Sequence, residues 1–450
     1  MAVALIILAA GKGTRMQSDL PKVLHKIAGA PLLVHAMKSA ASIEPEKTIV
    51  VAGHGADLVG DAARDWSDDA EIVLQVDQLG TGHAVLQAKA ALADFDGDAI
   101  VLYGDTPFIQ PETLEAMIAK RDTTDVVVLG FDAADPGRYG RLVMDGNSLD
   151  AIVEFKDADA ATRKIPLCNS GVIAAKSDVL FDLLDAVTDD NAAGEFYLTD
   201  IIGIARAQGL SAGVVRCDEA ETMGINSRAE LAVAEAAFQT RARCAAMDNG
   251  VTLQAPDTVY FSHDTYVGAD TIVEPNVVFA VGVTVENNAQ IRAFSHLEGC
   301  HVSRGGVIGP YARLRPGAEL AEDVKIGNFV EIKKAVIGEG AKVNHLSYIG
   351  DADIGPRSNI GAGTITCNYD GVFKHRTTIG ADVFVGSNTM LVAPVTLGDE
   401  SMTATGTIVT RSVPDGDLAV GRARQENKTG FARRMFEKLK LKKAKAGKGA

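Results

Sequence analysis

An apolar residue, replaced once by threonine, recurs at every sixth position from Val267 to Val409, and this repeat constrains the fold more than any other feature of the chain. The interval drops to five residues before Val302, Ile337 and Ile354. A period of six matches neither an α-helix nor an isolated β-strand. It predicts a β-solenoid whose short strands each send one side chain inward, rather than a β-sandwich, whose turns are spaced by roughly eight to twelve residues. The repeated positions, called anchors, are Val267, Val273, Phe279, Val285, Ile291, Leu297, Val302, Ile308, Leu314, Leu320, Ile326, Ile332, Ile337, Val343, Ile349, Ile354, Ile360, Ile379, Val385, Leu391, Leu397, Thr403 and Val409.

The repeat fails between Ile360 and Ile379. The segment 367–376, CNYDGVFKHR, is polar, aromatic and charged where the repeat would place aliphatic residues. Insertions in a solenoid leave as loops on one face, which is often the binding face. We therefore expect this insertion to carry functional side chains.

Length and composition limit the whole chain. At 450 residues it is too long for a single hydrophobic core, which predicts two or more domains. We expect no membrane insertion, because no apolar run approaches the roughly 18 residues of a membrane-spanning helix and the first residues lack the features of a signal peptide. Five scattered cysteines show neither disulfide nor metal-ligand spacing, which favours a reducing cytoplasm; they are Cys168, Cys217, Cys244, Cys300 and Cys367.

Charge is distributed unevenly along the chain. The net charge of −15 argues against general nucleic-acid binding. Residues 433–448 are nevertheless strongly basic and rich in lysine. We expect a solvated, poorly ordered tail there, and the alternative is an interaction patch.

The N-terminal part alternates between strand-like and helix-like segments. Residues 3–8, VALIIL, form a continuous apolar run of the kind that is buried on both faces of a parallel sheet. This alternation predicts a doubly wound α/β sheet, with ligands beyond the carboxyl ends of its strands. Further strand-like runs lie at 48–52, 71–75, 99–103 and 125–131, and helical patterns cover 31–41 and 111–121.

A glycine-rich turn follows the first apolar run. Gly11-Lys12-Gly13-Thr14 is not a P-loop, because a P-loop carries Gly-Lys-Ser/Thr at its end. Arg15 and Lys22 place two cations beside backbone N–H groups freed by the glycines, and this combination can hold a triphosphate. The alternatives are a simple tight turn and a solvated surface lysine.

Residues 8–16, LAAGKGTRM, followed by Leu20-Pro21-Lys22, resemble the signature of the sugar-1-phosphate nucleotidylyltransferases. Together with the six-residue repeat, the chain resembles the bacterial bifunctional N-acetylglucosamine-1-phosphate uridylyltransferase/glucosamine-1-phosphate acetyltransferase family, from about Leu5 to Arg422. The resemblance implies an α/β Rossmann-like nucleotidyltransferase domain joined by a long helix to a left-handed parallel β-helix of hexapeptide repeats. It implies acetylation of glucosamine 1-phosphate by acetyl-CoA, and then UMP transfer from UTP to give UDP-N-acetylglucosamine and pyrophosphate, for peptidoglycan and lipopolysaccharide precursor synthesis.

The resemblance assigns a nucleotide and sugar site to the N-terminal domain. Arg15 and Lys22 would be catalytic and stabilise the departing pyrophosphate. The amide of Gln75 can pair with a pyrimidine edge, whereas His83 is expected to be a helix-start residue rather than a catalyst. The assigned binding residues are Leu8, Ala9, Ala10, Gly11, Lys22, Gln75, Gly80, Thr81, Tyr103, Gly104, Asp105, Gly140, Glu154, Asn169 and Asn226.

Asp105 follows the strand-like run 99–103 and would project toward a metal-bound phosphate. A carboxylate there suits Mg²⁺, which usually takes only one or two protein ligands. The alternative is a turn or helix-cap aspartate. The resemblance makes Asp105 and Asn226 the metal ligands, and it implies in-line attack on the α-phosphorus of UTP, with catalysis mainly by positioning and electrostatics.

A connecting helix is expected between the two parts. Ser227-Arg228-Ala229-Glu230 is a capping box, and no Gly or Pro interrupts the alanine-rich segment 232–247 before Asn249-Gly250. We predict a uridylyltransferase domain at 1–226, a linker helix at 227–250, a hexapeptide-repeat acetyltransferase domain at 251–425 and a basic tail at 426–450.

His345 lies two residues after the anchor Val343. A histidine can accept a proton from an amine as it attacks a thioester, although a solitary histidine is usually structural. The resemblance makes His345 the general base, with no acyl-enzyme on Cys367. It assigns substrate contacts to Arg315, Lys333, Tyr348, Asn359 and Lys374, and acetyl-CoA contacts to Ala362, Asn368, Tyr369, Ser387, Thr405 and Arg422. Thr405 departs from the alanine usual in the family, but its contact can be made through the backbone.

The resemblance also implies partners: Mg²⁺ as cofactor, glucosamine 1-phosphate, acetyl-CoA and UTP as substrates, and a homotrimer with acetyltransferase sites shared between subunits. One alternative is a glucose-1-phosphate nucleotidylyltransferase with a regulatory solenoid, which would not need His345, Tyr348 and Lys374. Another is an assembly or exchange-factor subunit, which would not need Lys22, Asp105 and Asn226 either.

Overall fold

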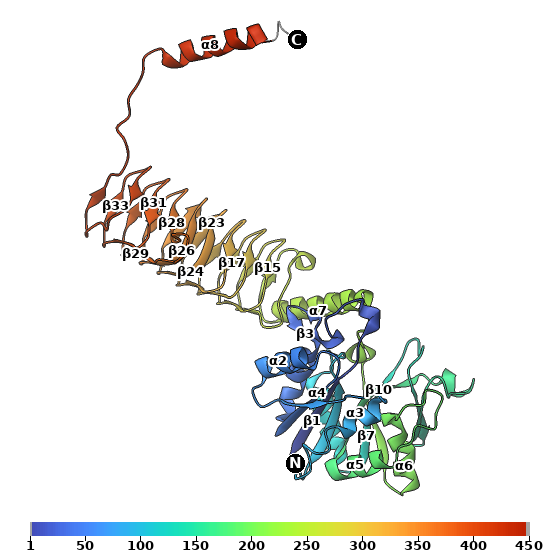
Figure 1. Ribbon diagram of the computed structural model, residues 1–450. Coiled ribbons are helices and arrows are strands. Elements are labelled where there is room, and N and C mark those ends of the chain that lie inside the picture. The colour runs from blue at the N-terminus through green and yellow to red at the C-terminus, as the bar shows by residue number, and fades with distance from the viewer. Residues whose placement is uncertain (1, 447–450) are drawn as a thin grey trace. The chain divides into compact units, whose positions relative to one another are not determined.

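The computed structural model describes residues 2–446, which divide into two compact units. Unit 1 comprises Met1–Ala245 and Phe261–Asp264, and unit 2 comprises Ala246–Tyr260 and Thr265–Ala450. Unit 1 is an α/β structure, and unit 2 is a stack of repeated β-coils (Figure 1). Among residues 2–446, no helix combines the length and the apolarity that crossing a bilayer requires.

Unit 1 is built on a nine-stranded sheet with the order β11-β7-β10-β6-β1-β4-β5, and β8 and β9 form a hairpin beside β10. Strands β6, β1, β4 and β5 are parallel, whereas β10 runs antiparallel to β6 and β7. The strands are β1 Val3–Ala9, β4 Lys47–Ala52, β5 Glu71–Leu74, β6 Asp98–Tyr103, β7 Val126–Asp132, β8 Arg141–Asp145, β9 Ser148–Val153, β10 Leu167–Lys176 and β11 Ala212–Cys217, with a separate pair β2 Lys26–Ile27 and β3 Ala30–Pro31.

Helices cover both faces of this sheet because β1 is apolar on both sides. Val3, Leu5 and Ile7 pack with α1, α2 and α4, whereas Ile6 and Leu8 pack with α3, α5 and α6. The two layers confirm the predicted doubly wound arrangement; the antiparallel β10 and the β8–β9 hairpin were not predicted. The helices are α1 Leu32–Ala40, α2 Ala56–Trp66, α3 Thr81–Leu86, α4 Pro111–Arg121, α5 Ser177–Asp185 and α6 Ile201–Ala207, with short 3₁₀ turns η1 Thr14–Met16, η2 Lys22–Leu24, η3 Ala41–Ile43, η4 Thr162–Lys164, η5 Leu198–Asp200 and η6 Glu219–Thr222.

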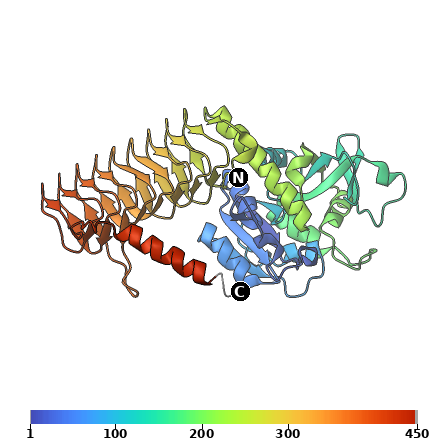
Figure 2. The same ribbon diagram turned by 90° about the horizontal axis from the view of Figure 1, so that it is seen from above.

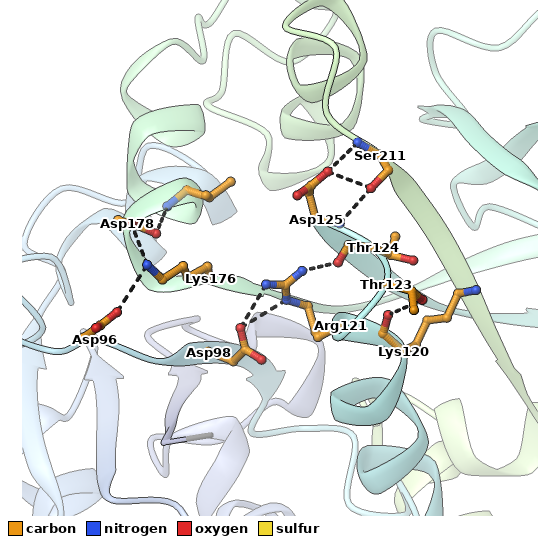
Figure 3. A network of polar contacts seen from close by, with 11 residues as sticks. Asp96, Asp98, Lys120, Arg121, Thr123, Thr124, Asp125, Lys176, Asp178 and Ser211 are labelled. Atoms are coloured by element: carbon orange, nitrogen blue, oxygen red, sulfur yellow. Dashed lines mark hydrogen bonds and ion pairs between the residues drawn. The ribbon is translucent and has the colours of Figure 1, made fainter.

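A polar network holds the amino ends of the strands of this sheet (Figure 3). Arg121, at the end of α4, donates to the buried carboxylate of Asp98 at 3.0 Å and also to the carbonyl of Thr124. Asp125 and Ser211 exchange hydrogen bonds just before β7 and β11. These contacts fix the amino ends of the strands and leave the carboxyl ends available for a site.

Helix α7, Arg228–Asp248, confirms the predicted connecting helix. The Ser227 hydroxyl accepts a hydrogen bond from the Glu230 N–H at 3.2 Å, as a capping box requires. The Glu230 carboxylate accepts from the N–H of Asn226 at 2.6 Å, one residue earlier than in the standard motif. The helix cap therefore also fixes the backbone of a predicted site residue.

Unit 2 confirms the predicted parallel β-helix, and Figure 2 shows its coils stacked in succession. One sheet contains β12 Thr252–Leu253, β14 Ile272–Val273, β17 Gln290–Ile291, β20 Val307–Ile308, β23 Lys325–Asn328, β25 Lys342–His345, β27 Asn359–Ile360, β30 Phe384–Val385, β33 Met402–Thr403 and β35 Leu418–Ala419. The 3₁₀ turn η7, Pro256–Thr258, lies in the first coil. The other faces share β24 and β26 and contain β13 Tyr266–Val267, β15 Val278–Phe279, β16 Val283–Val285, β18 His296–Leu297, β19 Cys300–Val302, β21 Arg313–Leu314, β22 Ala318–Leu320, β24 Glu331–Ile337, β26 Tyr348–Ile354, β28 Ile365–Cys367, β29 Thr377–Ile379, β31 Met390–Val392, β32 Val395–Leu397 and β34 Ile408–Val409.

The anchors form the core of the coils. Every anchor from Val273 to Val409 is buried, and only Val267, in the first coil, is half-buried. Cys300 pairs with Ala318, 18 positions later, whereas Ala318 pairs with Ala335, 17 positions later. The five-residue intervals therefore shorten individual coils by one residue and leave the anchors facing inward.

The C-terminal segment differs from the expectation of a poorly ordered tail. Residues 431–446 form a helix, α8 (Phe431–Ala446), and all of its residues are exposed. Lysine, arginine, leucine and alanine are good helix formers, and Gly430 precedes the helix with a φ of 70°. The helix propensity of these residues thus outweighs the repulsion between their positive charges. Residues 447–450 of the predicted basic tail lie outside the described residues.

Candidate functional site

The carboxyl end of β1 borders a cavity of about 380 Å³, within the size range of small-molecule sites. Its walls come from the segments that follow β1, β5 and β6, all parallel strands on the same side of the sheet's order, with β4 between β1 and β5. Most of the nucleotide-binding residues predicted from the sequence line it. The lining residues are Leu8, Ala9, Ala10, Gly11, Lys22, Val23, Gln75, Gln78, Gly80, Thr81, Ala84, Tyr103, Asp105 and Glu195.

The glycine-rich turn brings its backbone against Lys22. Gly13 has a φ of 60°, and a Cβ added there would lie 2.5 Å from the Cβ of Lys22. Any side chain at this position would therefore push the turn away from Lys22. Gly11 lines the cavity and has open space around its missing Cβ.

Lys22 joins the two residues predicted to hold a metal. Its ammonium donates to the carboxylate of Asp105 and to the Asn226 side-chain oxygen at 2.9 Å. Asn226 reaches this point because the Ile225 N–H donates to the Asp105 carbonyl at 3.0 Å. Two oxygen ligands from distant parts of the sequence thus converge on one position where a cation is stabilised.

Gln75 and Gly80, which were predicted to bind the uridine, form one side of the cavity. The buried Gln75 amide donates to the Gly80 carbonyl at 3.1 Å and contacts the His83 ring at 3.2 Å. Gly80 has a φ of 117°, and an added Cβ would lie 2.6 Å from the Phe196 carbonyl oxygen, so only glycine fits. His83 lies in the first turn of α3, which confirms its interpretation as a helix-start residue.

A second cavity, of about 580 Å³, adjoins the first and shares Thr81, Tyr103 and Glu195 with it. It contains two of the predicted sugar-binding residues, Glu154 and Asn169. Its full lining is Thr81, Tyr103, Arg138, Glu154, Phe155, Lys156, Asn169, Ala193, Glu195, Tyr197 and Thr199. The two adjoining cavities offer space for two ligands that share a boundary.

Burial shapes the chemistry of this second cavity. It raises the pKa of Glu154, which accepts a hydrogen bond from the Thr199 hydroxyl at 3.3 Å. Gly140 leaves room beside Glu154, because an added Cβ would lie 3.3 Å from its carboxylate oxygen. The Asn169 N–H donates to the Gly140 carbonyl at 2.9 Å, so these three predicted residues are neighbours. Burial also raises the pKa of Tyr103.

Arg15 does not join this group of residues. It lies on η1, is exposed, and within the described part of the chain lines neither of the two cavities. Gly104, by contrast, directly follows β6, and its N–H donates to the Leu8 carbonyl at 3.0 Å, so it packs against the floor of the first cavity.

In unit 2, His345 lies at the end of β25, directly before Leu346 in a row of left-handed corner residues. Phe294, Tyr311, Phe329 and Leu346 have φ values between 52° and 60° and expose large side chains on successive coils. The row continues through Gly363, Asn388 and Gly406, where the side chains are small or absent. His345 therefore stands where this row changes from bulky to small, and the small half leaves space along the coils.

A neighbouring amide orients His345. The His345 Nδ1 and the Asn328 side-chain oxygen, on adjacent coils, are 2.8 Å apart. An amide oxygen only accepts, so Nδ1 carries the proton and Nε2 keeps its lone pair. His345 itself is exposed. The imidazole is thus poised to accept a proton at Nε2.

Three cations of unit 2, Arg315, Lys333 and Lys374, lie near one another. The side chain of Lys374 lowers the pKa of Lys333, with Arg315 contributing in the same direction, which shows that the three cations are close together. Arg315 also donates to the Glu331 carboxylate at 2.8 Å. Such a cluster of cations is a binding site for an anionic group such as a phosphate. Tyr348 folds over Gly350, whose missing Cβ would lie 2.4 Å from the tyrosine hydroxyl.

The insertion in the repeat forms a short hairpin, and it supplies Lys374. Ala352 pairs with Thr377, 25 positions later, where the other coils take 17 or 18. His375 contacts Asp370 at 2.7 Å and, with the backbone N–H groups of Phe373 and Val372, lowers the pKa of Asp370 to about 2. These bonds hold the hairpin in shape.

The predicted acetyl-CoA residues lie along the small half of the corner row and beside it. The carbonyls of Ala362 and Ser387 accept from the next coil at 2.7 and 2.8 Å, and Arg422 donates to the Thr405 carbonyl at 2.5 Å. Asn359 lies on β27, four positions before the corner residue Gly363. Asn368 donates to the Asp351 carboxylate at 2.5 Å, and Tyr369 is exposed on the hairpin. The five cysteines are free, and burial raises the pKa of Cys367.

Comparison with known proteins decides the family. Residues 5–192 match the MobA-like NTP transferase domain, and residues 376–411 match the hexapeptide repeat of succinyl-transferase. The chain is 64% identical over 449 residues to the bifunctional protein GlmU of Ruegeria sp. (strain TM1040), with both chains covered completely. The identity is 64% to GlmU of Roseobacter denitrificans over all of both chains, and 67% to GlmU of Ruegeria pomeroyi over 99% of each. The chain belongs to the bifunctional GlmU family.

Membership of the GlmU family confirms the resemblance found in the sequence and fixes the activities. The chain is a bifunctional enzyme, a UDP-N-acetylglucosamine pyrophosphorylase and a glucosamine-1-phosphate N-acetyltransferase. Its substrates are nucleotides and acetyl-CoA together with the amino sugar phosphate. This result excludes a nucleotidylyltransferase with a purely regulatory solenoid and excludes a scaffold subunit.

The structure adds site residues that sequence reasoning missed. Gln78 donates to the Ala10 carbonyl at 2.7 Å and lines the first cavity, and Glu195 lines both cavities. Asn328 and Glu331 contact His345 and Arg315. Gln78 follows Gln75 in the same segment and could have been included from the sequence. Asn328 lies 17 positions before His345, one coil of the repeat, and that spacing was a usable signal.

Proposed function

We propose that the two adjoining cavities of unit 1 form the uridylyltransferase site of this enzyme. The observation that carries this proposal is the convergence of Lys22 with Asp105 and Asn226 at the carboxyl end of β1. UTP would occupy the first cavity, with its base near Gln75 and Gly80. N-acetylglucosamine 1-phosphate would occupy the second, near Glu154 and Asn169. Both ligands meet where Thr81 and Tyr103 form the shared wall.

The chemistry of this site is positioning and charge stabilisation. A phosphate oxygen of N-acetylglucosamine 1-phosphate attacks the α-phosphorus of UTP in line, the bond to the β-phosphate bridging oxygen breaks, and pyrophosphate leaves. The Lys22 ammonium and the N–H groups of the glycine-rich turn stabilise the negative charge on the phosphates. Arg15, exposed on η1, would act on the pyrophosphate from the solvent side.

Asp105 and Asn226 fit the proposed magnesium site. Their side chains supply two oxygen ligands, and both oxygens contact the same ammonium, so they address one point. Among residues 2–446 no cluster of three or more His, Cys, Asp or Glu side chains is arranged to hold a metal, which agrees with an ion that takes only one or two protein ligands. Bound there, Mg²⁺ would neutralise phosphate charge as it develops.

We further propose that His345 is the general base of acetyl transfer. The amine nitrogen of glucosamine 1-phosphate attacks the thioester carbon of acetyl-CoA, the C–S bond breaks, coenzyme A leaves, and His345 Nε2 takes the amine proton. Arg315, Lys333 and Lys374 would hold the sugar phosphate. The small corner residues from Gly363 to Gly406 would accommodate the pantetheine arm.

We further propose that the chain forms a homotrimer, acts in the cytoplasm and consists of four functional segments. The exposed stack of Phe294, Tyr311 and Phe329, with ring centroids 4.9 and 5.2 Å apart, is an apolar surface that supports association between copies. The free cysteines support a reducing compartment. We keep 1–226 and 251–425 as the two catalytic segments, 227–250 as the linker helix and 426–450 as the basic C-terminal segment. Sedimentation velocity of the full chain tests the trimer, and a monomer at assay concentration would refute it.

Asp105→Ala tests the uridylyltransferase site. We expect this variant to lose Mg²⁺-dependent formation of UDP-N-acetylglucosamine by at least about 100-fold, as is typical when an electrostatic group is removed from a site of charge transfer. Acetyl transfer by the same protein sample should be unchanged and shows that the chain is folded. Asp122→Ala, at the exposed end of α4, is the matched control. Near-normal turnover of Asp105→Ala would remove the metal role.

His345→Ala tests the acetyltransferase site, and here acetyl transfer should be lost while uridylyl transfer is kept. A general base contributes roughly 10²- to 10⁴-fold, so acetyl-CoA consumption should fall by that factor while uridylyl transfer persists. His296→Ala, an exposed histidine on β18 of the same β-helix, is the control. Acetyl transfer at the original rate in His345→Ala would refute the base role.

A further inference from the structure

Helix α8 carries two features that neither catalytic site uses. Its 16 residues are all exposed, and they include five large apolar side chains, Phe431, Met435, Phe436, Leu439 and Leu441, each at least 43% exposed. Against a single carboxylate, Glu437, the helix carries the cations Arg433, Arg434, Lys438, Lys440, Lys442, Lys443 and Lys445. This strongly basic helix stands in a chain whose net charge is −15. Such a concentration of charge and apolar surface needs a partner of its own.

Four of these apolar side chains share one face of α8. At about 100° per residue, Phe431, Met435, Leu439 and Phe436 fall within an arc of about 140°. Arg434, Lys438 and Lys445 flank this arc on one side, and Arg433 and Lys440 flank it on the other. Lys442 and Lys443 fall near the edges of the arc in the last turns, where long lysine stems can turn their ammonium groups outward. Of the large apolar side chains of α8, Leu441 alone lies outside the arc, toward the opposite face, where Glu437 and Ala444 also lie.

We propose that α8 is a peripheral membrane anchor that lies in the surface of a bilayer containing anionic phospholipid. A bilayer surface supplies negative charge for the flanking cations and, a few ångströms deeper, an apolar layer for the aromatic and aliphatic face. A nucleic acid would satisfy the charges but leave Phe431, Phe436 and Leu439 in water. At 16 residues the helix is about 24 Å long and too short to span the hydrocarbon core, so it binds in the plane of the surface.

Flotation of the full-length enzyme with lipid vesicles tests this proposal. The enzyme should float with vesicles of phosphatidylcholine mixed with phosphatidylglycerol and stay behind with vesicles of phosphatidylcholine alone. Raising salt from about 0.1 M to about 1 M shortens the Debye length from about 10 Å to about 3 Å and should weaken binding at least about tenfold. Absence of binding to the anionic vesicles at low salt would overturn the proposal.

Matched variants separate the helix face from its charge. Phe436→Ser with Leu439→Ser keeps every cation and should reduce vesicle binding at least about tenfold, whereas Leu441→Ser removes an apolar side chain from the opposite face and should bind as the unmodified enzyme does. Both activities should persist in all of these variants, because α8 buries no side chain. Equal loss of vesicle binding in the two variants, or full binding by Phe436→Ser/Leu439→Ser, would refute insertion of this face. Binding would then depend on the positive charge only, which is what a nucleic acid or an acidic protein would recognise.

A fluorescence measurement gives a second, independent readout. The chain has a single tryptophan, Trp66 on α2, so Trp66→Phe allows one reporter to be placed on α8. With Trp66→Phe, a Phe436→Trp reporter should shift to shorter wavelength on anionic vesicles, and a Leu441→Trp reporter should not. A shift of neither reporter, or of both alike, would contradict the orientation proposed for the helix.

Discussion

Replacing Asn328 tests the reasoning about the acetyltransferase site most directly, because the sequence pattern alone gives this residue no role. Its side-chain oxygen lies 2.8 Å from His345 Nδ1. When Nε2 takes the amine proton, the ring becomes charged and this contact becomes a hydrogen bond to a charged donor. Such bonds contribute about 1.5–3 kcal/mol, which corresponds to roughly 10- to 150-fold in rate.

For Asn328→Ala we expect the loss to lie near the lower end of that range. His345 is exposed in this chain, so water can replace part of the lost acceptor. We therefore predict that kcat for acetyl transfer falls about tenfold, with a smaller change in KM for glucosamine 1-phosphate, because Asn328 acts through the base and not through the cation cluster. Asn328→Asp retains an oxygen acceptor and should lose less.

The assay follows the release of coenzyme A thiol from acetyl-CoA, and uridylyl transfer by the same sample reports that the chain is folded. Gln290→Ala, an exposed amide on β17 of the same β-helix, is the control for removing an amide from the outer surface. A kcat for Asn328→Ala within about twofold of the unmodified enzyme would refute the positioning role. A rise in KM with unchanged kcat would indicate substrate binding instead.

Three further predictions concern stability. Ile349→Ala removes a fully buried anchor and should lower the free energy of unfolding of the β-helix by about 2–5 kcal/mol in denaturant titrations. Thr378→Ala, at an exposed position, should change this free energy by less than about 0.5 kcal/mol. Similar values for the two variants would refute the anchor role. Ser227→Ala should cost about 1 kcal/mol in the same measurement on unit 1 and Ser227→Asp much less, and equal stability of both variants would contradict the cap. Burial raises the pKa of Glu154 above its ordinary value of 4.5, so the folded state holds the proton more tightly. The contribution of Glu154 to stability is therefore complete below that ordinary pKa and is lost as pH rises through the raised folded pKa. Glu154→Gln should therefore gain stability relative to the unmodified enzyme across that window, and parallel stability curves at all pH values would refute the burial effect.

Much of the fold followed from periodicity. The six-residue repeat located the coils between Val267 and Val409 except at the insertion, because one inward position per strand must be apolar in a solenoid and the buried anchors match that requirement. The run Val3–Ala9 located the central strand β1, since a strand covered on both faces must be apolar throughout. The antiparallel β10 escaped prediction because an apolar run does not encode the direction in which a strand enters the sheet.

The candidate sites were also predictable only in part from the sequence. The glycine-rich turn and the segment around His345 were recognisable as motifs, since each combines several chemically unusual residues within a short stretch. The partner of His345 was not identified from the sequence, because the 17-residue spacing to Asn328 becomes a contact only when the coils stack. The basic C-terminal segment was interpreted from its charge, whereas its helix depends on residue propensities that act locally.

By itself the sequence determined the two kinds of architecture and the residues that could do chemistry, because periodicity and motif composition are local properties of the chain. Only the tertiary structure decided which of those residues meet. Lys22, Asp105 and Asn226 come from segments up to 204 positions apart and converge because parallel strands end at one edge of a sheet and the Ile225–Asp105 backbone bond closes the gap.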